Sequence, residues 1–114
     1  MSTPAVLPED NHAERRRSPR QLRDVPLLIR GDSSLEQQPF QEETFTISIS
    51  DYGALVLLAA RVVLGQRLLL VNLSTQNKME GWVARLGPPY GGLAQVGIEF
   101  AQPAPEFWPA QSLQ

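Results

Sequence analysis

The chain has 114 residues, of which 42% are hydrophobic and 19% are charged, with no cysteine and a formal net charge of −2. This size suits one small domain and excludes a multi-domain enzyme. The lack of cysteine excludes disulfides and thiol-based catalytic or metal sites. The single histidine, His12, argues against a histidine-ligated metal and is more simply a solvated residue than a general base. No apolar run reaches the roughly 18–20 residues that span a bilayer, and residues 1–14 lack the apolar core of a secretory signal. We therefore expect a soluble, cytoplasmic domain that is not an enzyme.

The N-terminal region divides into a polar leader and a basic arm. Residues 1–14 contain two prolines and no hydrophobic period, which predicts a disordered leader. Residues 15–30 hold six arginines against one acid, a local charge of +5, whereas the rest of the chain carries −7. Arginine suits phosphate because its planar guanidinium donates two parallel hydrogen bonds and stays protonated. A solvated basic arm is the plainer interpretation of these arginines taken alone.

From residue 25 onward the pattern is that of short strands. In residues 44–50 the apolar Phe45, Ile47 and Ile49 alternate with polar residues, so we expect these three side chains on the apolar face. Residues 94–100 alternate in the same way. The six expected strands cover 25–29, 44–50, 54–58, 66–73, 79–86 and 94–100. Six short strands without an amphipathic helix indicate an antiparallel all-β barrel or sandwich.

Two connections and the C-terminal region complete the expected fold. Residues 51–53 read as a tight turn, and the glycine- and proline-rich residues 87–92 read as a turn throughout. Residues 101–114 read as a tail with one helical turn at most. Within it, the apolar pair Phe107 and Trp108 is expected to cap the open end of the barrel.

A second polar segment, Ser-Ile-Ser-Asp-Tyr-Gly at 48–53, lies where a strand enters a turn. Ser48 and Ser50 share one face of the strand, and their hydroxyls can donate and accept hydrogen bonds there. Gly53 either adopts a positive φ or lets a ligand approach the backbone. Taken alone, an ordinary hairpin turn explains this segment.

Together the two segments resemble the PilZ domain family, whose signature is R-x-x-x-R followed by [D/N]-x-S-x-x-G. Arg16 and Arg20 match the first motif, and Ser50 and Gly53 match the second about 30 residues later. The terminal Gln-Val-Gly-Ile-Glu-Phe strand (95–100) also looks like PilZ. The resemblance covers about residues 14–108. It implies a six-stranded antiparallel β-barrel of PilZ type at 15–108, with a flexible N-terminal arm at 15–24 and a short tail at 109–114.

The resemblance further implies a receptor for the bacterial second messenger cyclic di-GMP. Arg16 and Arg20 are expected to grip phosphate and guanine, with Arg15 and Arg17 as helpers, and the Ser50 hydroxyl to face guanine or phosphate. On ligand binding the arm is expected to order over the barrel and signal to an unidentified protein partner. No other cofactor or metal, no DNA or RNA and no membrane-spanning segment is expected, and the chain is expected to be a monomer or a weak dimer.

One motif position departs from the family pattern, because Ser48 stands where aspartate or asparagine is usual. A hydroxyl offers one contact where a carboxylate or amide engages the guanine edge at two points. That difference is worth about 1–3 kcal/mol, or about ten- to a hundredfold in affinity. Asp51 lies on the other face of the turn and is not expected to substitute. Ser48 therefore keeps open an alternative, a degenerate PilZ domain that binds no nucleotide and acts as a protein-interaction module.

A small RNA-binding barrel is a third hypothesis, since barrels of this size bind single strands. It requires aromatic side chains interleaved with basic ones. Phe45 and Phe100 are expected on apolar strand faces, Phe107 and Trp108 lie in the tail, and none of the eight aromatic residues is expected beside the arginines. The pattern therefore disfavours RNA binding.

Overall fold

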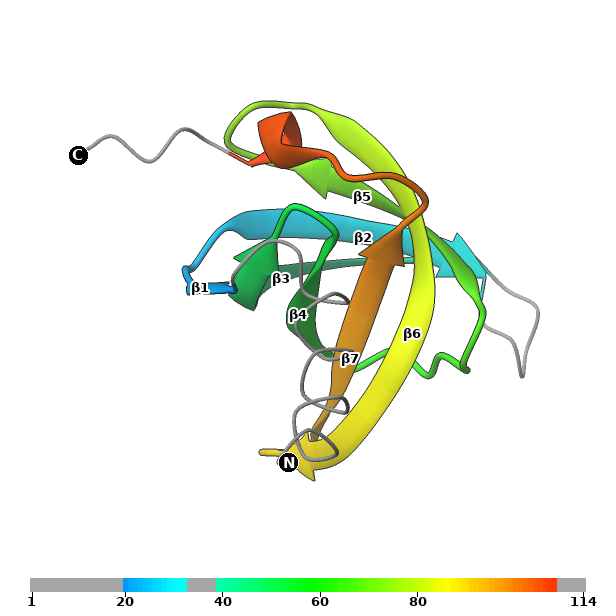
Figure 1. Cartoon of the computed structure of the whole chain (residues 1–114). Helices are drawn as coiled ribbons and strands as arrows, with labels where there is room; N and C mark the ends of the chain where they lie inside the picture. The colour runs from blue at the N-terminus through cyan, green and yellow to red at the C-terminus, as the bar shows by residue number, and fades with distance from the viewer. Residues whose placement is uncertain (1–19, 33–38, 109–114) are drawn as a thin grey trace, which may run out of the picture.

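All six expected strands form in the computed structural model, which describes residues 20–32 and 39–108 (Figure 1). They pair in the order β3-β2-β5-β6-β7-β4, and β4 also pairs with β3, so the antiparallel sheet closes into a barrel. The strands are β2 (Pro26–Asp32), β3 (Pro39–Ser50), β4 (Gly53–Leu58), β5 (Arg67–Asn72), β6 (Lys78–Tyr90) and β7 (Leu93–Phe100). The predicted six-stranded all-β barrel is confirmed.

A seventh, two-residue strand was not expected. β1 (Gln21–Leu22) pairs antiparallel with the end of β3, where Gln21 lies opposite Ile49 and Leu22 opposite Ser48. The last part of the basic arm is thus held on the barrel by backbone pairing. The predicted leader at 1–14, the arm residues 15–19 and the tail at 109–114 lie outside the described residues, so those boundaries stay predictions.

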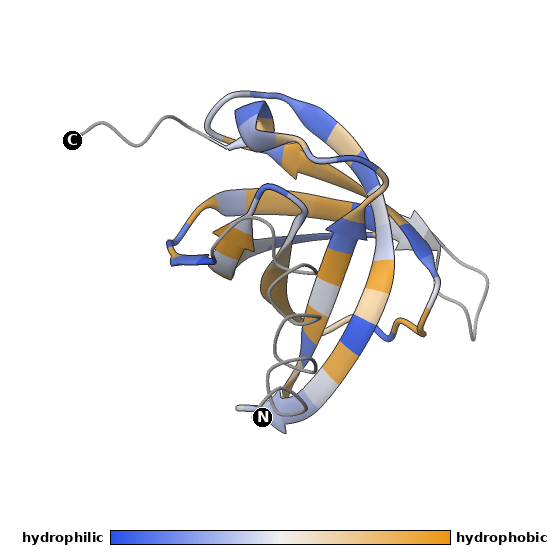
Figure 2. Ribbon diagram, in the orientation of Figure 1, coloured by the Kyte–Doolittle hydropathy of each residue, from blue (hydrophilic) through white to orange (hydrophobic). Residues whose placement is uncertain are grey.

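The barrel interior is filled by side chains from all six long strands. Along β6 and β7 hydrophobic and hydrophilic residues alternate (Figure 2), as a closed barrel requires of strands with one buried face. In β7 the predicted inward face is confirmed, since Val96, Ile98 and Phe100 are buried. The largest fully buried apolar side chains are those of Phe107, Leu27, Ile29, Leu58, Leu68, Leu70, Val56, Val83 and Val96.

The predicted apolar face of β3 is wrong in its first half. Phe45 is 60% exposed, whereas its neighbour Thr46 is only 2% exposed. The reason is a β-bulge. Thr46 pairs with Val56 and Ser48 pairs with Leu55, the residue adjacent to Val56 on β4, so Ile47 is an extra residue on β3. The bulge exchanges the two faces of the strand, because alternation restarts after the inserted residue.

The expected turn at 87–92 is much shorter than predicted. β6 continues to Tyr90, and only Gly91 and Gly92, with φ of 60° and 84°, form the turn. Two consecutive positive φ values suit a two-residue hairpin turn, for which Gly-Gly is a favoured sequence. Pro88 and Pro89 fit within the strand because the β6–β7 register shifts between Leu86 and Pro89, and a bulge tolerates a residue without an N–H donor.

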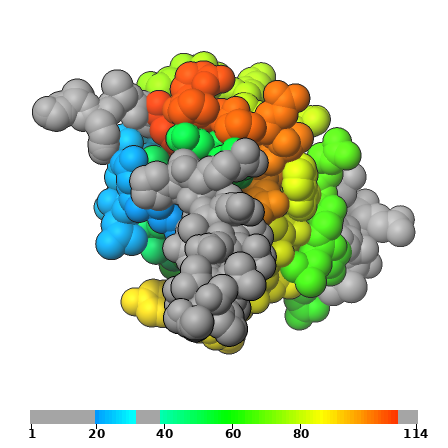
Figure 3. Space-filling model, viewed as in Figure 1, coloured from blue at the N-terminus to red at the C-terminus, as the bar shows by residue number. Residues whose placement is uncertain are grey.

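The C-terminal residues pack back onto the barrel. After β7 comes a single 3₁₀ turn, η1 (Pro105–Phe107), and both Phe107 and Trp108 are buried, in line with the expected apolar role of the pair. The two rings pack edge to face, with their centroids 4.8 Å apart. The Asn72 side-chain amide donates to the Phe107 carbonyl oxygen at 2.8 Å. In Figure 3 this orange-to-red segment lies directly beside the yellow-green residues of β5 and the following turn. Within the described ranges, no helix has the length and apolar character needed to cross a bilayer.

Candidate ligand-binding site

The candidate site begins with a row of residues across the outside of the barrel. Ser48 on β3 lies opposite Leu55 on β4, Leu55 lies opposite Gly97 on β7, and Gly97 lies opposite Arg85 on β6. Side chains two positions apart along a strand point to the same face, so Ser50 lies on the same face of β3 as Ser48. Strand pairing therefore aligns Ser48 with an arginine that is 37 positions later in the chain.

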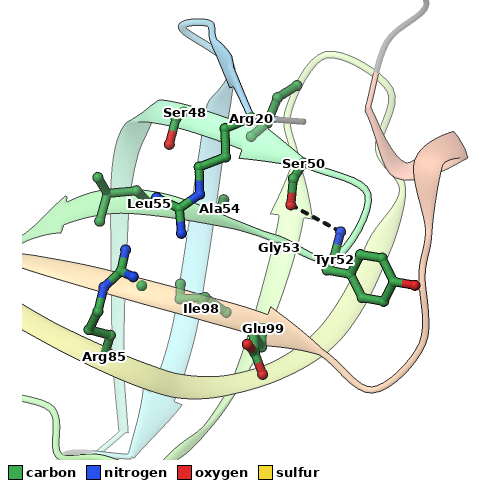
Figure 4. Close-up of a pocket in the computed structure, with 12 residues that line it drawn as sticks. Arg20, Ser48, Ser50, Tyr52, Gly53, Ala54, Leu55, Arg85, Ile98 and Glu99 are labelled. Atoms are coloured by element: carbon green, nitrogen blue, oxygen red, sulfur yellow. Dashed lines mark hydrogen bonds between the residues drawn. The ribbon is translucent and has the colours of Figure 1, made fainter. Parts of the chain in front are cut away.

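A pocket lies over this row and the end of β1, and it brings together four of the seven sequence-predicted site residues. Arg20, Ser48, Ser50 and Gly53 all line it (Figure 4). The other three, Arg15, Arg16 and Arg17, lie outside the described residues. These three remain predictions.

The arm is anchored just after Arg20 by the buried Thr46. The Thr46 hydroxyl accepts a hydrogen bond from the Val25 N–H at 2.9 Å and donates one to the Arg23 carbonyl oxygen. Backbone pairing of β1 with β3 adds a second attachment. Arg20 immediately precedes β1, so these two attachments direct its side chain over the end of β3 (Figure 4).

The two serines at the motif positions, Ser48 and Ser50, differ in what they can offer a ligand. The Ser50 hydroxyl accepts a hydrogen bond from the Tyr52 N–H at 3.1 Å, a local contact that stabilises the turn. Its own proton remains able to donate. Ser48 is 6% exposed and makes no side-chain hydrogen bond within residues 20–32 and 39–108. The Ser50 hydroxyl thus stabilises the turn, whereas the Ser48 hydroxyl is available to a ligand but is largely covered.

Gly53 is required by close packing of two strands. A Cβ built on it would lie 1.9 Å from the carbonyl oxygen of Ile98 in β7, far inside van der Waals contact. The approach of a neighbouring backbone therefore explains this glycine, and a ligand is not needed to explain it. The motif glycine lets β4 and β7 close together under the pocket.

The turn that follows Ser50 is held by the end of β7 and the C-terminal segment after it. The Ala104 N–H donates to the Asp51 carbonyl oxygen at 2.7 Å, and the Phe100 N–H donates to the Tyr52 carbonyl oxygen at 2.8 Å. Neither contact could be predicted, because the partners are about 50 positions apart and nothing in the local pattern connects them.

Arg85 and Glu99 also line the pocket, and neither was predicted. Their strands were expected, but an exposed charged residue on an outer strand face carries no signal that distinguishes a site from ordinary surface. Tyr52 corrects another expectation, that no aromatic residue lies beside the arginines, because it lines the same pocket as Arg20. Its ring nevertheless points away from Arg20 (Figure 4), so it does not form a base-stacking platform next to the guanidinium.

The chemistry of the pocket suits an anion. Two guanidinium groups can donate paired hydrogen bonds to phosphate oxygens, and the serine hydroxyls can donate or accept. The floor includes the small residues Gly53, Ala54 and Gly97, which leave the strand backbone open to close approach. Within residues 20–32 and 39–108 no cluster of His, Asp or Glu could hold a metal ion.

No protein-family model matches the chain, and no curated protein matches it either. Among solved structures it is similar to the inhibitor of motility (MotI/DgrA) from Bacillus subtilis, with a TM-score of 0.60 and 20% sequence identity. The six-stranded antiparallel barrel is the fold that the resemblance to PilZ domains implied. The match covers 80% of this chain but only 44% of the B. subtilis chain, and at this identity it concerns the fold alone.

Proposed function

We propose that this protein is a receptor for cyclic di-GMP that acts in the cytoplasm without catalytic activity. The observation that carries the proposal is the meeting of Arg20, Ser48 and Ser50 at one pocket of a PilZ-type barrel. Arg20 is 28 positions before Ser48 in the chain, so their proximity is a property of the fold.

Binding would rest mainly on charge-assisted hydrogen bonds. The ligand carries two phosphate charges, and the +5 segment at residues 15–30 would attract it on an otherwise acidic chain. Arg20 would bind a phosphate from its anchored position beside β1, with Arg16 from the same motif and Arg15 and Arg17 assisting. The hydroxyls of Ser48 and Ser50 would contact guanine or phosphate.

Signalling would follow from ordering of the arm. The entropy lost when the arm settles on the ligand is offset by the new hydrogen bonds, and the covered face becomes a new surface for a partner protein. The structural likeness to an inhibitor of motility makes a component of a motility apparatus one partner to test.

Isothermal titration calorimetry with cyclic di-GMP tests the proposal. We expect saturable binding by the unaltered chain and a loss of at least about tenfold in affinity in the Arg16→Ala/Arg20→Ala double variant. Arg61→Ala, which removes one exposed charge away from the pocket, serves as the control and should bind normally. Absence of heat at ligand concentrations of tens of micromolar, or unchanged binding by the double variant, would overturn the proposal.

The burial of Ser48 favours a second candidate, a degenerate domain that binds partner proteins without nucleotide. Ser48 is only 6% exposed and lies opposite Leu22 of β1, so its single hydroxyl is less accessible than a longer aspartate or asparagine side chain would be. A chain that gives no calorimetric signal with cyclic di-GMP, yet acquires binding with Ser48→Asp, would establish this candidate.

A further inference from the structure

The pocket contains a second arginine that no sequence motif contributes. In a regular strand Arg85 would point inward with Val83, which is 1% exposed, because side chains two positions apart share a face. The register shifts between them, however. Val83 pairs with Ile98 and Arg85 pairs with Gly97, so Ala84 is an extra residue on β6. This bulge turns Arg85 to the outer face of the barrel, and bulges beside functional sites commonly redirect a side chain in this way.

Gly97 leaves room for the redirected side chain. A Cβ built on Gly97 would lie 3.3 Å from the Arg85 Cβ and 3.6 Å from its Nε, so Arg85 lies across the β7 backbone at the place where a side chain is missing. Figure 4 shows the guanidinium groups of Arg85 and Arg20 directed toward one another from opposite sides of the β4–β7 pair. One arginine comes from the arm and the other from the barrel wall.

Nothing in the described part of the chain neutralises Arg85. Within residues 20–32 and 39–108 it makes no hydrogen bond or ion pair, whereas Arg67, also on the outer surface, lies 3.6 Å from Glu80. Two guanidinium groups that converge over one pocket repel each other, and an anion placed between them attracts both and outweighs that repulsion. A phosphate between them would contact Arg85 on β6 from one side and Arg20 on the arm from the other.

We propose that Arg85 is a ligand-binding residue, which donates hydrogen bonds to a phosphate of cyclic di-GMP from the side of the pocket opposite Arg20. The inference rests on the proposed function and extends it to a residue outside both sequence motifs. Arg85 and Ser48 stand at the two ends of one cross-strand row. Ser48 occupies the motif position where aspartate or asparagine is usual. Arg85 therefore supplies a charged contact to the ligand from β6, at the opposite end of the row from Ser48.

Calorimetric titration of Arg85 variants with cyclic di-GMP tests the inference. We expect Arg85→Ala to lower affinity by about ten- to a hundredfold, since it removes a charge-assisted hydrogen bond. Arg85→Lys should lose less, because lysine keeps the charge but not the paired donors. Arg61→Ala, the loss of the same charge at an exposed position away from the pocket, should leave affinity unchanged. Arg85→Ala should also make binding less sensitive to added salt than Arg61→Ala does.

The possible outcomes separate the two proposals. Arg85 is exposed, so Arg85→Ala should unfold at the same temperature as the unaltered chain. Normal binding by the unaltered chain together with equal affinity in Arg85→Ala would overturn the role of Arg85 and leave the proposed function intact. Equal losses in Arg85→Ala and Arg61→Ala would also overturn it, since they would reflect net charge alone. No binding by the unaltered chain would overturn both.

Discussion

The indole N–H of Trp108 donates to the backbone carbonyl oxygen of Ser50 at 2.7 Å, across 58 positions of the chain. The next two carbonyl groups of the turn, those of Asp51 and Tyr52, also accept hydrogen bonds from residues 100–104. The last residue of β7 and the C-terminal segment after it thus satisfy three successive carbonyl groups beside the pocket. The position of the Ser50 hydroxyl depends on residues that lie after the last strand.

Trp108→Phe should lower the free energy of unfolding by about 1–3 kcal/mol. The substitution keeps an aromatic ring but removes the donor, which leaves the Ser50 carbonyl oxygen without this partner. Trp82→Phe, at a half-buried position on the outside of β6, is the matched control and should cost less. Urea unfolding followed by circular dichroism measures both. Equal stability of Trp108→Phe and the unaltered chain would contradict a structural role for this bond.

Thr46→Val should weaken both the fold and ligand binding. It replaces a hydroxyl that bonds to Val25 and Arg23, at a cost of about 1–3 kcal/mol in stability, and it loosens the attachment of the arm that carries Arg20. Thr44→Val is a control on the same strand, because its hydroxyl donates to the Leu57 carbonyl oxygen at 2.8 Å and does not hold the arm.

Calorimetry should therefore distinguish the two threonine variants. We expect both to lose stability in urea unfolding, but only Thr46→Val to lose affinity for cyclic di-GMP by more than the change in folded fraction explains. The same affinity in both variants would show that the arm does not depend on Thr46.

Ser48→Asp should raise the affinity for cyclic di-GMP by about ten- to a hundredfold. The carboxylate would supply the two-point contact to guanine that the resemblance to PilZ domains implies at this position, and Arg20, which lines the same pocket, compensates part of the cost of placing a charge at a buried position. Ser74→Asp adds the same charge in an exposed turn and should leave affinity unchanged. An Ser48→Asp variant that is stably folded but binds no better would show that this position does not contact the ligand.

Gly53→Ala should destabilise the barrel by about 3 kcal/mol, because its Cβ would overlap the Ile98 carbonyl oxygen and force β4 and β7 apart. A control is Gly65→Asn. Gly65 has a φ of 84° and open space around it, and asparagine tolerates this backbone conformation, so the free energy of unfolding should change little. If thermal unfolding of the two variants shows similar losses, the close approach at Gly53 is not what requires glycine there.

Much of the fold was accessible to sequence reasoning because alternation is a local property. Val96, Ile98 and Phe100 share a face by their spacing alone, and a buried apolar face follows wherever such a strand joins a barrel. The sequence also predicts the candidate residues Arg20, Ser48, Ser50 and Gly53, which line one pocket, because they occupy positions of two short motifs whose order and spacing can be read directly from the chain.

The sequence alone therefore determined the six long strands and four of the residues that meet at the pocket, but not the short strand β1. Tertiary structure decided which faces of β3 and β6 point outward, because a bulge appears only when a strand is paired with its neighbours. It thereby placed Thr46 inside, Phe45 outside and Arg85 in line with Ser48. Strand register is a relation between segments far apart in the chain. No local pattern encodes this register. Simple alternation from Val83 would place Arg85 on the inner face of β6, and Arg85 lines the pocket only because the pairing of β6 with β7 contains a bulge.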